Sequence, residues 1–363
     1  MTNFDEYIRQ REPEQQEKGY IWQTAIGLQM VDGLKPSAYL IETAKQNIEG
    51  DITFDEVKSR IDAYYKTQSN RQTDTDDRTE EADKVSARIA EILSEKTFSF
   101  SPAEYLNIHR RLFSGVYKFA GKIRDYNITK SEWVLNGETV LYASADTVRA
   151  TLEFDFEQEK AFSYKGLSKL QIMEHIARFV AYLWQIHIFG EGNTRTTAVF
   201  LIKYLRELGF KDISNELFAE HSWYFRNALV RANYQDITRG IHKTNKYLIR
   251  FLSNLLLNEN NILKNRELNI SFVETANVGV KENTPNLLGA NDTEKLGVKL
   301  NKNQYKILQL IEINDKITII EMAKSLSISE TAVENNIKKL REKGILSRVG
   351  SDKTGCWKIT IKT

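Results

Sequence analysis

Apolar residues recur at α-helical spacing through most of the chain, and this pattern limits the fold more than any other feature of the sequence. In the clearest example they share one helical face: Ile172, Ile176, Phe179, Val180 and Leu183. Ser168 and Gln171 form a capping box where this helix begins. A second helix is predicted from about Thr196 to Leu208, ended by Gly209. Alternating strand patterns are scarce, so we expect a mainly α-helical protein.

One β-hairpin is expected within this helical chain. Residues 133–141 place apolar stretches on both sides of Asn136-Gly137. Asn-Gly between two such stretches is a strong signal for a tight hairpin turn. The sequence therefore predicts a hairpin that projects from the helical core.

The chain is too long for a typical single domain, because 363 residues correspond to two or three domains. Residues 66–84 are polar and charged, which predicts a solvated connector, and helical periodicity is lost again around Pro285. We predict an N-terminal helical segment, a central helical domain, a linker and a C-terminal module at residues 1–66, 85–263, 264–297 and 298–363.

Composition excludes several classes of protein. Lys and Arg number 51 against 49 Asp and Glu, so no global charge marks a nucleic-acid or membrane binder. The single cysteine, Cys356, excludes a disulfide framework and is typical of the reducing cytoplasm. We find neither a signal-peptide pattern nor an apolar run of the roughly 20 residues needed to span a bilayer. We therefore expect a cytoplasmic protein that does not bind membranes.

The two central helices are joined by a segment rich in reactive groups, His187 to Arg195. Gly190 and Gly192 allow the backbone to approach a ligand closely, and the N–H groups at the start of the second helix suit phosphate oxygens. Arg195 can bind a phosphate with two hydrogen bonds, and Glu191 is a hard oxygen ligand that suits Mg²⁺. A neutral His187 can accept a proton from an attacking hydroxyl.

Together these groups predict transfer of a phosphate ester from a nucleotide–metal complex. The alternative is an ordinary loop in which His187 and Phe189 are core residues at a helix end. The remaining histidines show no metal-binding spacing, so we assign core or surface roles to them: His109, His175, His221 and His242.

The segment resembles the signature of the Fic family, His-x-Phe-x-Asp/Glu-Gly-Asn-Gly-Arg-x-x-Arg. Residues 109–124, which end in Phe119-Ala120-Gly121-Lys122-Ile123-Arg124, resemble a second landmark of that family. The resemblance extends over about residues 90–260. It implies a helical core with a hairpin "flap", and transfer of AMP from ATP, with Mg²⁺, to a hydroxyl group of a target protein.

Carried over to this chain, the resemblance makes His187 the general base for a Tyr, Ser or Thr hydroxyl of the target. Phe189 would anchor the loop, and Glu191 would hold Mg²⁺. The ATP phosphates would contact the remaining signature residues, Gly190, Gly192, Asn193, Thr194 and Arg195. The flap would pair with the main chain of the target through Trp133, Val134, Leu135, Val140, Leu141 and Tyr142.

Two residues depart from the signature. Thr194 stands where most members have Gly, and Ala198 replaces the second Arg, which removes a phosphate contact. The related Doc group, which transfers a terminal phosphoryl group, carries Lys at the position of Thr194. We favour AMP transfer because Glu191-Gly192-Asn193 keeps the Gly of the Fic signature. Doc-like phosphotransfer, and a DNA-binding regulator whose Fic domain only senses nucleotide, are kept as alternatives.

An N-terminal stretch resembles the inhibitory helix of Fic antitoxins, Ser/Thr-x-x-x-Glu-Gly/Asn. Glu49 and Gly50 match this motif, whereas Lys45 occupies the Ser/Thr position. The family's cationic partner for this Glu is Ala198 here. We therefore predict a degenerate segment that packs beside the site and inhibits weakly; a helix with an ordinary Gly cap is the alternative.

The C-terminal residues 299–363 are basic, with 13 Lys and Arg against 7 Asp and Glu. Helices predicted at 301–313, 318–325 and 329–343 and two strands resemble a winged helix-turn-helix. Its third helix and wing would contact DNA through Thr331, Asn335, Lys338, Lys339, Arg348 and Lys353. Docking of a protein or dimerisation through the same module is the alternative, and the oligomeric state is left open.

Overall fold

The computed structural model describes residues 2–67, 74–210, 216–272, 302–313, 315, 317–326, 328–349 and 356–359. It divides into two compact units, residues 1–276 and 277–363. Each unit has its own apolar core. We describe the two units separately.

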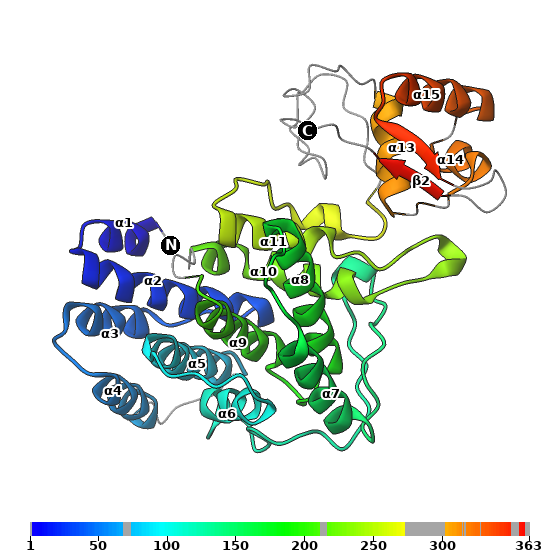
Figure 1. Ribbon diagram of the computed structural model, residues 1–363. Coiled ribbons are helices and arrows are strands. Elements are labelled where there is room, and N and C mark those ends of the chain that lie inside the picture. The colour runs from blue at the N-terminus through cyan, green and yellow to red at the C-terminus, as the bar shows by residue number, and fades with distance from the viewer. Residues whose placement is uncertain are drawn as a thin grey trace. The chain divides into compact units, whose positions relative to one another are not determined.

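The first unit is built mainly from α-helices, with a long connection between α6 and α7 (Figure 1). Its α-helices are α1 Thr2–Arg9, α2 Pro13–Gly27, α3 Ala38–Glu49, α4 Phe54–Thr67, α5 Asp74–Ser94, α6 Pro102–Phe113, α7 Val148–Ala161, α8 Lys169–Ile186, α9 Asn193–Glu207, α10 Glu216–Asn233 and α11 Lys246–Leu257. Its 3₁₀ helices are η1 Leu28–Asp32, η2 Trp133–Leu135, η3 Ile237–Arg239 and η4 Asn265–Leu268.

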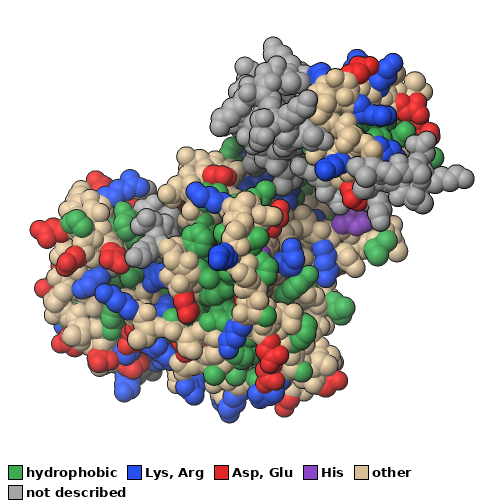
Figure 2. Space-filling model, viewed as in Figure 1, with side chains coloured by type: hydrophobic (Ala, Val, Ile, Leu, Met, Phe, Trp, Pro, Cys, Tyr) green, Lys and Arg blue, Asp and Glu red, His purple; other side chains and the backbone are tan. Residues whose placement is uncertain are grey.

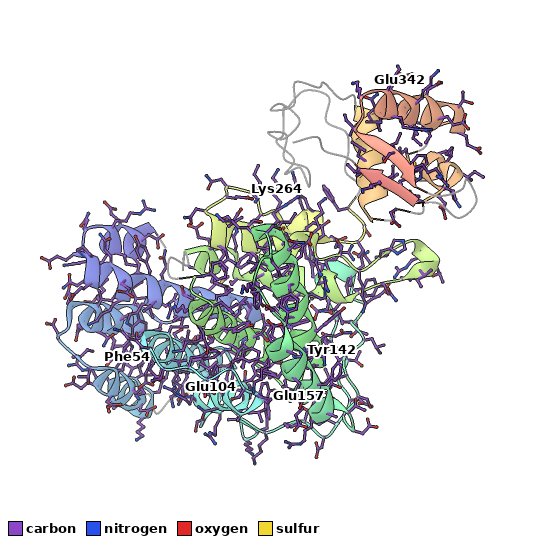
Figure 3. The ribbon with its side chains drawn as sticks, in the orientation of Figure 1. Phe54, Glu104, Tyr142, Glu157, Lys264 and Glu342 are labelled. Carbon is purple, nitrogen blue, oxygen red and sulfur yellow. The ribbon has the colours of Figure 1, made fainter. Side chains whose placement is uncertain are left out.

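Helix α9 lies at the centre of this unit. All of its residues from Asn193 to Leu205 are buried, and α5, α6, α8 and η1 pack around it. Side chains fill the interior between these helices (Figure 3). Because α9 is enclosed on every side, the loop that enters it is held by the core rather than by solvent-exposed contacts.

The predicted helices around the central segment are confirmed. Ser168 and Gln171 form the capping box at the start of α8, and Gly209 follows α9 with a φ of +95°. Helix α9 begins at Asn193, three residues before the expected Thr196, because Gly192 takes the N-cap position with a φ of +78°. Thr194 and Arg195 therefore lie in the first turn of the helix.

The predicted connector at residues 66–84 is wrong for its second half, since residues 74–84 belong to α5. Several of its charged side chains have partners within the fold. Asp83, which is fully buried, accepts a hydrogen bond of 2.7 Å from the Tyr65 hydroxyl. Lys84 forms ion pairs with Asp62 at 3.0 Å and with Glu80 at 2.8 Å.

The predicted hairpin has its turn but no strands. Asn136 and Gly137 both have left-handed backbone angles, as the Asn-Gly signal requires. Trp133–Leu135 forms η2 instead of a strand. A hydrogen bond of 2.9 Å from the Glu132 N–H to the carbonyl of Glu138 closes the segment around this turn. We call this segment, residues 130–142, the ribbon.

Residues 264–272, which we predicted to be part of a linker, pack against this ribbon. Leu268 in η4 is fully buried, and the Ile270 N–H donates to the carbonyl of Val134 at 2.8 Å. The rest of the predicted linker, from residue 273, lies outside the described residues.

The described residues of the second unit form three helices and two strands. They are α13 Lys302–Ile313, α14 Ile319–Leu326, α15 Glu330–Glu342, β1 Leu346–Val349 and β2 Cys356–Ile359. The strands pair antiparallel, with Leu346 opposite Ile359. Ser329 caps α15, and the capping box of Thr318 with Glu321 starts α14. The winged helix-turn-helix prediction is confirmed.

Acidic and basic side chains alternate over the visible face of the first unit, in keeping with the small net charge (Figure 2). None of the helices in the described part of the chain is long and apolar enough to cross a membrane.

Candidate active site

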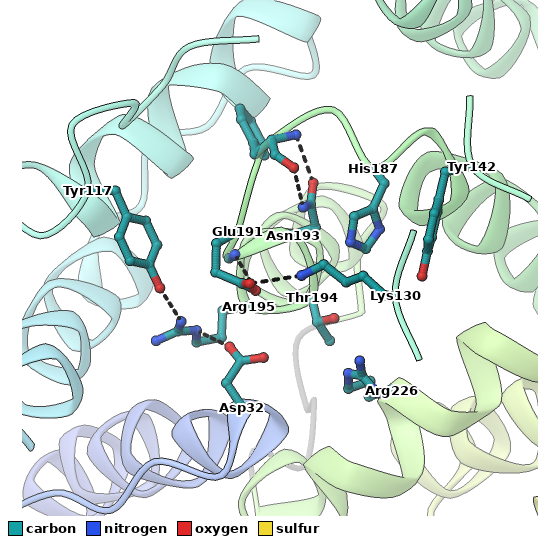
Figure 4. A network of polar contacts seen from close by, with 12 residues as sticks. Asp32, Tyr117, Lys130, Tyr142, His187, Glu191, Asn193, Thr194, Arg195 and Arg226 are labelled. Atoms are coloured by element: carbon teal, nitrogen blue, oxygen red, sulfur yellow. Dashed lines mark hydrogen bonds and ion pairs between the residues drawn. The ribbon is translucent and has the colours of Figure 1, made fainter. Parts of the chain in front are cut away.

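The loop between α8 and α9 is closed by its own side chains. Helix α8 ends at Ile186, and its C-cap residue His187 has a φ of +49° that turns the chain out of the helix. The side-chain amide of Asn193 forms two hydrogen bonds with the backbone of Phe189: it accepts from the N–H at 3.0 Å and donates to the carbonyl at 2.8 Å. Gly192 is required here, because a Cβ would lie 2.5 Å from the ring of Phe113. The Asn193 side chain therefore shapes the loop rather than facing a phosphate (Figure 4).

His109 holds the loop in place through hydrogen bonds and ring stacking. Its Nδ1 accepts from the Gly121 N–H at 2.8 Å, so its Nε2 carries the proton and donates to the Glu191 carbonyl at 3.0 Å. Its ring stacks on Phe189 with the centroids 3.6 Å apart. Burial lowers the pKa of His109 to about 4, which keeps it neutral. The core role assigned to His109 was correct, but its hold on the loop was missed.

Arg124 holds the other side of the loop. Its Nε donates to the His187 carbonyl at 2.7 Å, and its guanidinium also donates to the carbonyls of Tyr126, Ala143 and Ile186. Its backbone N–H donates to the carbonyl of Ile188 at 2.9 Å. One buried side chain thus satisfies the last carbonyls of α8 and ties them to the ribbon.

His187 is prepared to accept a proton. Its Nδ1 lies 3.3 Å from the carbonyl of Trp184, which can only accept, so Nδ1 carries the hydrogen and Nε2 keeps its lone pair. Burial, and then the positive charge of Lys130, hold the pKa of His187 well below its usual value. The ring is 4% exposed and lies under Tyr142, with the centroids 4.2 Å apart.

Glu191 is engaged by a cation from the ribbon. Lys130 Nζ lies 2.8 Å from Glu191 Oε2 (Figure 4). Burial raises the pKa of Glu191, but Lys130 and the Gly192 N–H outweigh it, so the net shift is downward and the group is ionised.

Arg195 is sequestered by residues of the N-terminal helices. It is fully buried, with Nη2 2.6 Å from Glu81 Oε1 and Nε 2.8 Å from Asp32 Oδ2. Nη1 donates to Gln29 at 3.0 Å, and Nη2 also contacts the Tyr117 hydroxyl at 3.2 Å. The predicted phosphate ligand is therefore bound to two carboxylates.

The two departures from the signature both face inward. The Thr194 hydroxyl accepts a hydrogen bond of 2.9 Å from Trp184 Nε1 and is directed into the protein. Ala198 is fully buried. Thr194 therefore adds no side-chain bulk to the ligand side, and the position of the second arginine offers no charge.

A pocket of about 600 Å³ opens beside this loop. Its lining includes Glu191 from the loop, Arg195 from the first turn of α9, Lys130 and Trp133 from the ribbon, and Arg226 from α10. Arg226 forms an ion pair with the fully buried Glu132 at 2.6 Å. His187 does not line the pocket, because Tyr142 and the loop enclose its ring.

The predicted flap side chains separate into two sets. Val134, Leu135, Val140 and Tyr142 are buried, whereas Trp133 is 50% and Leu141 83% exposed. The four buried side chains belong to the core, so only Trp133 and Leu141 can contact a partner directly.

Glu49 does not reach the loop. It ends α3, with Gly50 as the left-handed cap. Its carboxylate accepts from the Tyr7 hydroxyl at 2.8 Å and pairs with Arg11 at 3.2 Å. Weak inhibition by Glu49 and Gly50 stays a prediction, and the carboxylates that contact Arg195 come from η1 and α5.

The predicted DNA-contacting residues lie mostly on one face of α15. Thr331, Asn335, Lys338 and Lys339 are exposed. Arg348 lies over the ring of Trp357, 4.6 Å from its centroid. Lys353 lies outside the described residues.

The residues that sequence reasoning missed share one property. Asp32, Glu81, Arg124 and Lys130 all reach the loop from distant segments. Only Arg124 gave a signal, since it ends the stretch that resembles the second Fic landmark.

The loop fits a divalent ion that arrives with its substrate. Among the described residues no group of three His, Cys, Asp or Glu could hold a metal. Mg²⁺ is often held by one or two carboxylates and the phosphates of a nucleotide, and Glu191 supplies one such carboxylate at the pocket.

Comparison with known proteins agrees with this geometry. Residues 99–205 match the Fic/DOC family, and residues 300–347 match the winged helix-turn-helix DNA-binding family. The protein adenylyltransferase VbhT of Bartonella schoenbuchensis is 24% identical over 253 residues, covering 64% of this chain and 50% of that protein. The "Probable protein adenylyltransferase y4lH" of Sinorhizobium fredii is 29% identical over 152 residues, covering 42% of this chain and 73% of that protein.

The chain thus spans about half the length of the first of these relatives. Among solved structures, the N-terminal FIC domain of the Bep8 protein from Bartonella sp. 1-1C is 17% identical, with a TM-score of 0.40 over 52% of this chain and 88% of that one. The two family matches agree with the loop between α8 and α9: the chain contains a Fic/DOC domain at residues 99–205 and a winged helix-turn-helix domain at residues 300–347.

Proposed function

We propose that this protein transfers AMP from ATP to a hydroxyl group of a target protein. The observation that carries the proposal is the neutral His187, with its Nε2 lone pair free of the Trp184 contact, next to a loop whose Glu191 lines a pocket of about 600 Å³. Such a volume is in the range of small-molecule sites. The names of the two relatives support the same activity.

In this reaction the target hydroxyl gives its proton to His187 Nε2, and its oxygen attacks the α-phosphorus of ATP. A new P–O bond forms, the bond between the α-phosphorus and the bridging oxygen breaks, and pyrophosphate leaves. The N–H groups in the first turn of α9 have no intrahelical acceptors, so they can stabilise the phosphate oxygens. A divalent ion held by Glu191 would neutralise phosphate charge.

Phosphate transfer of the Doc type is less well supported. Doc-like proteins place a cation where this chain has Thr194, whose hydroxyl is engaged by Trp184 inside the protein. The backbone at Gly192 follows the Fic pattern, with a left-handed φ and close contact with Phe113.

Label transfer tests the proposal. ATP labelled at the α-phosphate, with Mg²⁺, is expected to mark a protein of the host lysate or the chain itself, and His187→Ala is expected to abolish the mark. Label from the γ-phosphate in the protein would show phosphotransfer instead. No transfer of either label, with duplex binding retained, would favour the regulator that only senses nucleotide.

DNA binding by the second unit is a second candidate function. Its basis is the exposed face of α15, where Lys338 and Lys339 lie two turns after Thr331 on a helix capped by Ser329. Full-length protein is expected to bind duplex DNA with an affinity that falls as salt increases, because lysine–phosphate contacts release counterions. Salt-independent binding to a protein partner would instead indicate a docking module.

We place this activity in the cytoplasm, since the single cysteine suits a reducing compartment. Self-modification and homodimer formation are part of the same proposal, and sedimentation of the unlabelled and labelled protein would test them.

A further inference from the structure

The cation that faces Glu191 comes from outside the Fic signature. The Lys130 ammonium lies 2.8 Å from Glu191 Oε2, and its backbone N–H is anchored on Thr139 Oγ1 at 3.2 Å. Two residues later, the ribbon is closed by the hydrogen bond between Glu132 and Glu138. The backbone of Lys130 is thus fixed, while its flexible side chain ends at the rim of the pocket.

The cation of the signature itself is tightly occupied. Arg195 is fully buried and contacts the carboxylates of Asp32 and Glu81 at 2.8 and 2.6 Å. A phosphate could bind this guanidinium only by displacing two carboxylates from a buried charge, which is strongly unfavourable. Ala198 offers no replacement. Of the other cations that line the pocket, Arg226 is paired with the buried Glu132 at 2.6 Å and Arg78 donates to the Asp32 carbonyl at 2.6 Å, which leaves Lys130.

Lys130 is held much less tightly. Its side chain is 23% exposed and that of Glu191 is 41% exposed, so water screens their attraction. A polyphosphate carries several negative charges, whereas Glu191 carries one. Exchange of the Lys130 ammonium from Glu191 to a phosphate is therefore favourable, and it needs only rotation of a four-carbon side chain.

We propose that Lys130 is the cation that receives the phosphates of the donor nucleotide. In the free protein it neutralises Glu191; when ATP binds, its ammonium moves to a phosphate oxygen and leaves Glu191 to the divalent ion. The inference rests on the proposed function and names a phosphate-binding residue that lies in the ribbon instead of the signature. A consequence is that Lys130 sustains nucleotide binding when no divalent ion is available.

Equilibrium binding of ATP to the full-length chain, in Mg²⁺ and separately in EDTA, tests this role. Lys130→Gln is expected to weaken binding about tenfold or more in EDTA, the size of one charge-assisted hydrogen bond. The loss in Mg²⁺ is expected to be smaller, because Glu191 without Lys130 holds the ion better. Lys130→Arg is expected to retain most of the affinity, and Lys122→Gln, an exposed lysine that does not line the pocket, is expected to change nothing.

The outcomes separate the two proposals. If the wild type binds no ATP in EDTA, or if Lys130→Gln binds as well as the wild type there, the role of Lys130 is refuted while AMP transfer in Mg²⁺ is unaffected. If the wild type binds no ATP even in Mg²⁺, both proposals fail. Thermal unfolding is the control: if Lys130→Gln unfolds at the same temperature as the wild type, its loss of affinity does not come from misfolding.

Discussion

The imidazole of His187 owes its charge state to its surroundings. It is enclosed by Tyr142 and Trp184, and the ammonium of Lys130 and the guanidinium of Arg226 add positive potential. Each of these effects disfavours the protonated ring, so the neutral form persists to lower pH than in an ordinary histidine. A general base must be neutral to accept a proton, and His187 is kept neutral by its surroundings without a carboxylate partner.

The acid limb of the pH–rate profile follows from this shift. A base loses activity when pH falls through its pKa, and the lowered pKa of His187 places this loss below pH 6.5, the ordinary value. We expect kcat/KM for AMP transfer to stay level as pH decreases from 7.5 to 6.5 and to decline only beyond that. A decline centred at or above pH 6.5 would contradict a buried His187 as the base.

At the same scale, sequence reasoning identified the loop residues but not their partners. The signature named His187, Glu191 and Arg195 as candidates. The Lys130–Glu191 contact spans 61 residues and the Glu81–Arg195 contact spans 114. No local pattern encodes contacts of this range, because they arise only when α5 and the ribbon pack against α9.

At the scale of elements, the loop and the helix it enters depend on a glycine. Gly192 combines a left-handed φ of +78° with close contact to the Phe113 ring. The ring of Phe113 also lies under the guanidinium of Arg195, 4.8 Å from its centroid. A side chain at position 192 would therefore disturb the loop and the buried ion pairs together.

Substitution of this glycine is expected to be costly. Gly192→Ala should lower the free energy of unfolding by about 2–4 kcal/mol, from backbone strain and overpacking against Phe113. Gly115→Ala is a matched control, since Gly115 has a φ of +73° but no atom lies within 4 Å of the place that a Cβ would take. It should lose only the strain, about 1–2 kcal/mol. Urea unfolding measures both; equal losses would show that the contact with Phe113 is unimportant.

Capping and turn signals predicted elements well where they act locally. The boxes at Ser168 and Thr318 begin α8 and α14 as expected. Charge was a misleading signal for residues 74–84, where it was taken as a sign of solvation although Lys84 pairs with Asp62 of α4 and Glu81 pairs with Arg195 of α9. The Asn-Gly signal led us to expect a complete hairpin, but Asn136-Gly137 fixes only the turn and not the strands beside it.

At the scale of the molecule, the described residues form two separate apolar cores. Helices α1 to α4 share the core of α8 and α9, so the N-terminal segment is part of the first unit, whereas the core of α13 to β2 is distinct. The domain boundaries predicted at residues 66, 85 and 263 fall inside the first unit. They follow changes in composition and helical periodicity along the sequence, and they stay a proposal.

Removal of the second unit is expected to separate two activities. A chain ending at residue 298 keeps every residue that lines the pocket and should retain ATP binding and the unfolding temperature of the first unit. It should lose salt-sensitive binding to duplex DNA. Calorimetry and a DNA-retention assay measure these effects. Loss of ATP binding on truncation would show that the two cores are not independent.

Under the proposed AMP transfer, the phenol ring of Tyr142 over His187 bears on what happens to ATP before a target protein binds. Bulk water is the most abundant hydroxyl donor around any bound ATP, and a base open to it would consume the nucleotide without modifying anything. His187 is 4% exposed and its ring lies against that of Tyr142, with the centroids 4.2 Å apart. Such a cover would restrict wasteful hydrolysis and reserve turnover for an oxygen presented by a docked protein.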